Sequence, residues 1–274
     1  MTTVERAQPD GNTGGGLVLG LERVSVHFGG IAALTNVDLA VDAGEVCGLI
    51  GPNGAGKTTL FDVVSGVRLP ETGRVMLDGS DITRWPAARR ARAGLRRTFQ
   101  RVQTYGWLSI GDNVLAALEW RGGGGGLPAD LLGLPTRRRR ERERRERVAH
   151  VLALCGLTAV ADHPAGSLPM GLARMVELAR AIVDPPRVLL LDEPTSGLGE
   201  GEMERLGERV RAIQTEESCA VLLVEHDVSF VMERCDRIAV LNLGEVIAVG
   251  SPKEIQSDAG VRKAYLGEQR TMGE

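Results

Sequence analysis

Between positions 51 and 59 the chain reads Gly51-Pro52-Asn53-Gly54-Ala55-Gly56-Lys57-Thr58-Thr59. This stretch matches G-x-x-x-x-G-K-[ST], in which glycines let successive backbone N–H groups turn toward one anion. The apolar residues 45–50 before it predict a strand buried on both faces, and residues 57–65 after it predict a helix whose positive dipole end faces that anion. Lys57 adds a charge for phosphate oxygens, and the Thr58 hydroxyl suits Mg²⁺. These features favour a nucleoside triphosphate site over a glycine-rich turn without a ligand.

Two acidic residues, Asp192 and Glu193, follow the apolar run at 188–191. At the carboxyl end of a parallel strand, Asp192 can reach a Mg²⁺ ion bound beside the phosphate loop. Glu193, one residue further on, is placed to orient and activate an attacking water molecule. The alternative is that both acids only cap the start of a helix. Beside a phosphate loop we favour a metal ligand at Asp192 and a catalytic residue at Glu193.

The remaining apolar patterns predict an α/β fold. Residues 17–19, 24–28 and 37–41 have strand-like spacing, and the latter two alternate with period two, as half-buried antiparallel strands do. Further strands are predicted at 73–77, 188–192 and 220–224, a late hairpin at 237–241 and 245–249, and helices at 172–183 and 202–215.

Between residues 105 and 169 the strand patterns give way to helical ones, interrupted by five glycines at 122–126 that indicate a flexible surface loop. Residues 137–147 carry eight arginines and three glutamates. Helical spacing predicts two ion pairs here, Glu141 with Arg145 and Glu143 with Arg147. A solvated helix face is the simplest interpretation, and contact with lipid headgroups or RNA is the alternative.

The composition limits the possible partners. The chain has 274 residues with 33 basic and 36 acidic side chains, and a net charge of −3 does not call for a nucleic acid partner. No segment approaches the roughly 18–20 apolar residues that span a bilayer. Residues 1–16 are polar and glycine-rich, which predicts a flexible tail rather than a signal peptide. Four isolated cysteines predict buried, reduced thiols. Any role at a membrane is therefore expected to go through a partner.

The phosphate loop, the Asp192-Glu193 pair and the triplet Glu225-His226-Asp227 together resemble the nucleotide-binding domain of ABC transporters. The resemblance covers residues 17–270. It implies an α/β P-loop NTPase of the ABC type, with a mixed sheet core, an antiparallel β subdomain and an inserted helical subdomain at about residues 105–172. The ligands that it implies are ATP and Mg²⁺.

The resemblance implies roles for three further residues. His226 would contact the γ-phosphate and support hydrolysis, although a lone histidine after a strand is otherwise usually structural. Gln100, in Thr98-Phe99-Gln100, would sense both Mg²⁺ and the attacking water, and would face the membrane subunit. Phe28 would stack on adenine, the alternative being an ordinary core phenylalanine.

The signature motif of the family departs from its usual form. Leu168-Pro169-Met170-Gly171-Leu172 stands where Leu-Ser-Gly-Gly-Gln is typical, and Gly199 stands where an aspartate is typical after the second acidic strand. Gly171 and the following helix remain, so backbone donation to a partner's ATP is retained. A glutamine at position 172 or 173 is usual, but the chain has Leu172 and Ala173. We therefore expect slow hydrolysis.

Four features resemble the branched-chain amino acid (LivG-type) importers, a group that includes urea and short-amide importers. They are Phe28-Gly29-Gly30, Arg97-Thr98-Phe99-Gln100, the signature without serine, and the ending Ala264-Tyr265-Leu266-Gly267-Glu268. The resemblance implies a peripheral subunit at the cytoplasmic face of the cell membrane. Its expected partners are a second ABC ATPase subunit in a head-to-tail homo- or heterodimer, two integral membrane permease subunits, and an extracytoplasmic substrate-binding protein.

Three other classes of protein are weighed against this interpretation. One is a nucleotide-responsive subunit that binds ATP with little hydrolysis, which the altered signature favours. Another is a soluble ABC ATPase of translation or DNA repair, but the chain has neither a second ATPase domain nor a long coiled-coil insertion. A small-molecule kinase shares the phosphate loop but not the combination of Gln100, Gly171 and His226.

Overall fold

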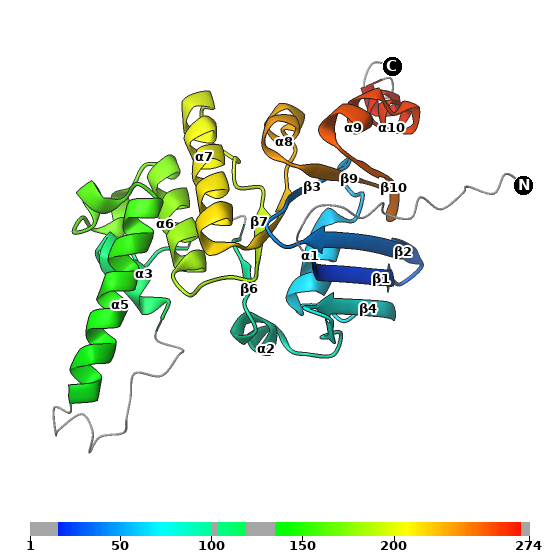
Figure 1. The fold of residues 1–274 in the computed structure, drawn as a ribbon. Helices are drawn as coiled ribbons and strands as arrows, with labels where there is room; N and C mark the ends of the chain where they lie inside the picture. Colours follow the sequence, from blue (N-terminus) through cyan, green and yellow to red (C-terminus); the bar gives the residue numbers. More distant parts are fainter. Residues whose placement is uncertain (1–15, 100–102, 119–134, 270–274) are drawn as a thin grey trace, which may run out of the picture.

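The computed structural model describes residues 16–99, 103–118 and 135–269. Its centre is a six-stranded sheet with the strand order β10-β9-β3-β8-β7-β6 (Figure 1). The strands are β3 (Val46–Ile50), β6 (Leu95–Arg97), β7 (Val188–Asp192), β8 (Ala220–Val224), β9 (Arg237–Asn242) and β10 (Glu245–Gly250). Neighbours pair in parallel except β10, which is antiparallel to β9. The sheet is therefore mixed, as predicted, although the apolar pattern did not predict β6.

The second sheet is antiparallel, with the order β2-β1-β4-β5. Its strands are β1 (Leu17–Phe28), β2 (Ile31–Asp42), β4 (Thr72–Leu77) and β5 (Ser80–Asp81). Separate strands at 17–19 and 24–28 were expected, but β1 runs through both. The register between β1 and β2 shifts between Leu21 and Val24, where Arg23 has a φ of 48° and its N–H donates to Asp38. This irregularity breaks the period-two pattern without ending the strand.

Helices cover both faces of the central sheet. They are α1 (Lys57–Ser65), α2 (Ala87–Arg92), α3 (Ile110–Ala116), α5 (Pro135–Leu154), α6 (Met170–Ile182), α7 (Glu200–Glu217), α8 (Val228–Arg234), α9 (Pro252–Ser257) and α10 (Ala259–Gln269). Two 3-10 turns, η2 (Thr158–Val160) and η3 (Ala165–Ser167), precede α6. In Figure 1, α3, α5 and α6 lie at one end of the molecule and the antiparallel sheet lies at the other.

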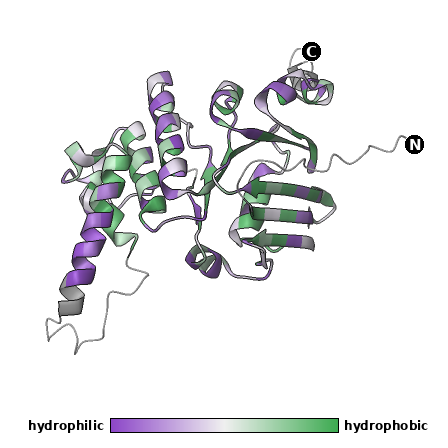
Figure 2. Cartoon of the chain, in the orientation of Figure 1, coloured by the Kyte–Doolittle hydropathy of each residue, from purple (hydrophilic) through white to green (hydrophobic). Residues whose placement is uncertain are grey.

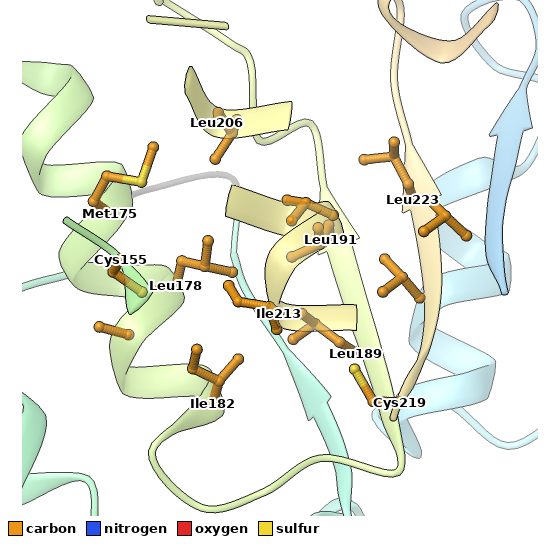
Figure 3. Packing of buried hydrophobic residues seen from close by; sticks show 14 of the residues in the cluster. Cys155, Met175, Leu178, Ile182, Leu189, Leu191, Leu206, Ile213, Cys219 and Leu223 are labelled. Carbon is orange, nitrogen blue, oxygen red and sulfur yellow. The ribbon is translucent and has the colours of Figure 1, made fainter. Parts of the chain in front are cut away.

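Alternate side chains of the central strands enter two different cores. In β7, Leu189 and Leu191 join a cluster with α6, α7 and α8, while Val188 and Leu190 join a cluster with α1 and the antiparallel sheet. Figure 3 shows Leu189 and Leu191 facing Leu178 of α6 and Ile213 of α7. Because both faces are buried, the strand reads as a continuous apolar run, and this explains why it could be predicted.

Within the described part of residues 105–172 there are helices and turns but no strand, apart from one isolated bridge. On α5 the predicted pair is present, with Arg145 Nε 2.8 Å from Glu141 Oε1. The predicted pair of Glu143 with Arg147 is wrong. Arg147 pairs with Glu217 of α7 at 2.8 Å, because it lies on the side of α5 that packs against that helix. Figure 2 shows the hydrophilic half of α5 extending beyond the body.

Two sequence predictions fall largely or wholly outside the described residues, namely the flexible tail at 1–16, of which only residue 16 is described, and the glycine loop at 122–126. Within the described ranges, no helix has the length and apolar character that crossing a bilayer requires. All four cysteines are free and buried, as predicted. Burial raises the pKa of the Cys155, Cys219 and Cys235 thiols to about 12, which keeps them protonated and unreactive at neutral pH.

Candidate nucleotide-binding site

The carboxyl ends of β3, β8 and β7 lie side by side, because β8 stands between the other two and all three run parallel. The phosphate loop follows β3, His226 follows β8 and Glu193 follows β7. In parallel α/β sheets, this edge is where ligands bind. The topology therefore brings together three sequence motifs that are far apart in the chain.

A cavity of about 220 Å³ opens at this edge. Its walls come from β2, the phosphate loop, the start of α1 and the two residues that follow β7 and β8. They are Ala33, Asn53, Gly54, Ala55, Gly56, Lys57, Thr58, Thr59, Glu193 and His226. Gly51 and Pro52, the first two residues of the loop, are buried and do not line the cavity.

Lys57 is buried at the first position of α1, and its ammonium group is held by the loop itself. Nζ donates to the carbonyl of Gly51 at 2.5 Å and to that of Pro52 at 2.9 Å. A lysine with only 6% of its surface exposed needs such partners, because an unpaired buried charge is costly. The contacts fix a positive charge in the wall of the cavity, where an anion would be attracted.

The start of α1 is built to leave its backbone donors to a ligand. Gly56 occupies the position before the helix with a φ of 108°, and a Cβ there would come within 2.4 Å of the Ala33 carbonyl oxygen. Only glycine fits this conformation and this close approach. No side chain caps the helix, and its first turn contains no acidic residue. The N-terminal amides, together with Lys57, fit a phosphate chain.

Glu193 and His226 meet across the cavity. Glu193 Oε1 lies 2.7 Å from His226 Nε2, and the Glu193 backbone N–H donates to the Val224 carbonyl at 2.9 Å. Glu193 has a φ of 47°, a conformation that is uncommon for residues other than glycine and that occurs at functional sites. The backbone is thus fixed where it turns the carboxylate toward the histidine.

Glu225, the residue before His226, stabilises the backbone around Glu193 and His226. It is buried, and its carboxylate accepts hydrogen bonds from the backbone N–H groups of Thr195 at 2.7 Å and His226 at 3.2 Å. Desolvation by burial raises the pKa of the Glu225 carboxyl above its ordinary value. The triplet at 225–227 implied a role only for His226. The position of Glu225 directly after a strand buried on both faces could have indicated that its carboxylate is buried at the site.

Asp192 is buried and does not line the cavity. Its Oδ2 accepts from Arg97 Nη2 at 2.9 Å, and its backbone N–H donates to Thr98 Oγ1 at 3.4 Å. The family resemblance included Arg97 but implied no role for it in the site.

A hydroxyl at Thr58 and a carboxylate at Asp192 are the hard oxygen donors that Mg²⁺ prefers. In the described part of the chain, no cluster of three or more histidine, cysteine, aspartate or glutamate side chains could hold a metal. The donor set fits an ion that takes most of its ligands from phosphate and water.

Gln100 lies outside the described residues, but the residue before it is firmly held. The Phe99 N–H donates to Glu177 Oε1 at 2.9 Å, and the Phe99 carbonyl accepts from Arg174 Nη1 at 3.1 Å. Arg174 and Glu177 are buried on α6 and pair with each other at 3.1 Å. Burial raises the pKa of the Glu177 carboxyl. The helix that begins at the signature motif therefore anchors the chain that leads to Gln100.

The remaining predicted residues lie away from this cavity. Phe28, at the end of β1, is 45% exposed, and the Arg68 guanidinium lies 4.2 Å from its ring centroid. Phe28 is thus not an ordinary core residue, and it does not line the cavity. Gly171 is buried in the first turn of α6, where a Cβ would come within 2.2 Å of Glu202 Oε1. It is not brought to the cavity either.

A second depression, of about 360 Å³, lies between β6, α2 and α6, and we call it the groove. Its lining combines apolar and charged side chains: Ser65, Val67, Ala87, Ala91, Leu95, Arg96, Arg97, Phe99, Gln103, Ala117, Glu177, Arg180, Ala181 and Asp184. Phe99, which lines the groove and is 53% exposed, directly precedes Gln100 in the chain.

Comparison with known proteins gives a consistent assignment. Residues 34–196 match the family model described as ABC transporter, and residues 245–271 match the one described as branched-chain amino acid ATP-binding cassette transporter. The chain is 39% identical over 251 residues to the high-affinity branched-chain amino acid transport ATP-binding protein BraF of Pseudomonas aeruginosa, covering 92% of this chain and 98% of that protein. It is also 38% identical over 234 residues to the lipopolysaccharide export system ATP-binding protein LptB of Acidithiobacillus ferridurans, covering 85% and 90%.

Among solved structures, an ATP-binding cassette of an ABC transporter in its ADP conformation superposes with a TM-score of 0.79. It is 30% identical in sequence, and the match covers 92% of this chain and 99% of that one. The fold, the family models and the relatives therefore agree. The chain belongs to the ABC transporter family, in its branched-chain amino acid branch, as an ATP-binding protein of the ATPase type that is coupled to transport.

Proposed function

We propose that this chain binds Mg·ATP in the cavity at the end of β3, β8 and β7 and hydrolyses it to drive import through separate membrane subunits. The observation that carries the proposal is the Glu193–His226 contact of 2.7 Å in the wall of the same cavity that the phosphate loop forms. A carboxylate beside a histidine, facing a cationic loop, supplies a group that can activate water next to bound phosphate.

Each residue has a distinct task in this proposal. Lys57 and the amides at the start of α1 bind the phosphate chain, and Thr58 and Asp192 would hold Mg²⁺, which neutralises charge on the phosphates. Glu193 polarises the attacking water, and His226 orients Glu193 and approaches the γ-phosphate. Gln100 would sense the metal and the water. Phe28 would stack on the adenine after Arg68 moves from its ring.

The working unit in this proposal is a head-to-tail pair with a second ABC ATPase subunit, either a copy of this chain or a sibling. The support is that Gly171, whose helix would donate to a γ-phosphate, does not line this chain's own cavity. In a head-to-tail pair, each signature helix serves the partner's ATP. The ATPase unit would span residues 17–270, with the helical subdomain at about 105–172.

The groove is the proposed contact with two integral membrane permease subunits, at the cytoplasmic face of the cell membrane. It combines exposed apolar surface at Phe99 with charged side chains, which suits a protein segment rather than a small ligand. An extracytoplasmic substrate-binding protein would deliver the cargo to those subunits.

Branched-chain amino acids, or related amides and urea, are the proposed cargo. The match at residues 245–271 and the similarity to BraF support this cargo, while the similarity to LptB would support export of a lipid-linked substrate. We favour the amino acids because the match at residues 245–271 supports this cargo from a segment outside the general ABC transporter match at residues 34–196. A second candidate is an ATP-binding subunit with little hydrolysis of its own, which Pro169, Leu172 and Ala173 in the signature favour.

The test is dimerisation of the Glu193→Gln protein with Mg·ATP, measured by light scattering on a sizing column. A dimer that appears only with ATP supports a working signature and a homopair. A monomer with bound ATP would mean either that a sibling ATPase subunit is required or that the altered signature no longer works, and the partner would then be sought. Lys57→Ala is the control: it should neither bind ATP nor dimerise, and tight binding by this variant would contradict the proposed phosphate site.

A further inference from the structure

Arg97 is the last residue of β6, and its guanidinium connects two parts of the proposed ATP site. Nη2 donates to Asp192 Oδ2 at 2.9 Å. Nη1 donates to Asp62 Oδ1 at 2.7 Å and to Ser65 Oγ at 3.0 Å. Asp62 and Ser65 lie on α1, the helix that begins at the phosphate loop. One side chain therefore ties the end of β7 to the helix that would hold the phosphates.

The surroundings keep this guanidinium in place. The Arg97 side chain is only 9% exposed and that of Asp192 only 10%. The guanidinium carbon lies 5.6 Å from the Phe61 ring centroid and 5.4 Å from the Phe99 ring centroid, within the range of cation–π contacts. A planar, multi-donor group in such a setting has a fixed orientation, which a lysine ammonium could not reproduce.

Asp192 is held at two points, by the last residue of β6 and by the residue after it. Its carboxylate is bound by Arg97, and its backbone N–H donates to the hydroxyl of the next residue, Thr98, at 3.4 Å. Outer groups that hydrogen-bond a metal-binding carboxylate set its orientation and tune its affinity for the ion. Arg97 is such an outer group, because it hydrogen-bonds the Asp192 carboxylate.

We propose that Arg97 is a positioning residue for Asp192: by holding one carboxylate oxygen, it orients Asp192 toward a Mg²⁺ ion bound with ATP. The inference rests on the proposed function, in which Asp192 is a metal ligand. It adds a residue that acts on the metal without touching it. Arg97 also lines the groove, so only one side chain separates the groove from the metal ligand.

The test measures metal binding rather than turnover. Mn²⁺ replaces Mg²⁺, the nucleotide is the non-hydrolysable β,γ-imido analogue of ATP, and free Mn²⁺ is followed by electron paramagnetic resonance. Arg97→Lys and Arg97→Gln should weaken Mn²⁺ binding by about 10–100-fold, the usual cost of losing an outer-shell partner. Binding of the analogue in EDTA should be unchanged in both variants. In an Asp192→Asn background, Arg97→Lys should have no further effect on Mn²⁺.

Two further variants separate positioning from structure. Arg237→Lys, on β9, which is separated from β6 by three strands, alters a partly buried pair with Glu45 and should leave Mn²⁺ binding unchanged. Asp62→Asn removes the other carboxylate that holds Arg97 and should weaken Mn²⁺ binding in the same direction but less. Should the Arg97 variants fail to fold, Asp62→Asn carries the test.

Unchanged or tighter Mn²⁺ binding in the Arg97 and Asp62 variants would overturn the inference. Failure of the unaltered chain to bind the analogue would instead overturn the proposed function, so the two failures are distinguishable.

Discussion

His226 Nε2 lies 2.7 Å from Glu193 Oε1, although the two residues are 33 positions apart and follow different strands. A carboxylate oxygen accepts, so this hydrogen bond requires the proton on Nε2. The family resemblance implied that His226 acts on the γ-phosphate. The structure adds a contact to the residue expected to activate water, and the two roles are compatible because both side chains line one cavity.

Replacing Glu193 with Gln should separate ATP binding from hydrolysis. The amide keeps the shape of the carboxylate but cannot polarise water, and we expect turnover to fall about 10²–10⁴-fold while ATP affinity is retained. Single-turnover hydrolysis and equilibrium ATP binding measure the two quantities. Glu204→Gln, an exposed carboxylate of α7, is the control and should leave both unchanged. A Glu193→Gln protein with most of its turnover would exclude the proposed role.

His226→Ala should also slow hydrolysis, by about 10²-fold, because Glu193 loses the group that orients it. If His226 acts through Glu193, the double variant should be no slower than Glu193→Gln alone, since both changes remove one unit. Single-turnover rates are compared for the unaltered chain, His226→Ala, Glu193→Gln and the double variant. Additive losses would show that His226 works independently of Glu193. His163→Ala, at an exposed histidine away from the cavity, is the matched control.

The signature can be tested by restoring glutamine. Ala173→Gln should raise turnover about tenfold, the worth of one added hydrogen bond to a charged group. Leu172→Gln should show the same gain in rate with some loss of stability, since Leu172, in the first turn of α6, packs against the core. Steady-state ATPase rates and thermal unfolding of both variants provide the readout. Unchanged rates in both would mean that the altered signature does not limit hydrolysis.

Much of the fold was predictable because buried strands and the phosphate loop are local patterns. The limits of α1 coincide with the predicted 57–65, and β3, β7 and β8 lie where continuous apolar runs occur. The strand β6 was missed, since three residues that include two arginines carry no apolar period. Which arginine is buried cannot be read from a chain in which 30 of the 33 basic residues are arginines. Arg97 and Arg90 acquire their roles only from partners distant in the sequence.

The role of the buried Arg90 can be tested by measuring the stability of a variant. It is fully buried, and its guanidinium donates to four carbonyls that include those of Val63 and Val64 in α1, while burial lowers its pKa to about 10. Arg90→Met would remove the donors to all four carbonyls, of which, within the described residues, that of Val63 alone keeps a bond from the Gly66 N–H at the end of the phosphate-loop helix. We expect the free energy of unfolding to fall by at least about 3 kcal/mol, from several losses of 1–3 kcal/mol each.

Urea denaturation measures this change, and Arg92→Met, at an exposed position of the same helix, is the control. Arg92→Met should shift the free energy of unfolding by no more than about 0.5 kcal/mol. Equal effects of the two substitutions would contradict the capping role of Arg90.

The buried Glu225 carboxyl should make stability depend on pH. Desolvation raises its folded-state pKa above the unfolded value, so the folded state binds more protons between the two. Stability from this group is then fully present below the unfolded pKa and is lost as pH rises through the folded pKa.

Glu225→Gln keeps an oxygen for the Thr195 N–H but cannot ionise, so it removes this loss. The variant should gain stability relative to the unaltered chain as pH rises from about 4, near the ordinary glutamate pKa, toward neutrality, in urea unfolding at each pH. Glu208→Gln, at an exposed position of α7, should give a difference that does not change with pH. A Glu225→Gln difference that is constant or declines with pH would show that the carboxyl is not destabilised by burial.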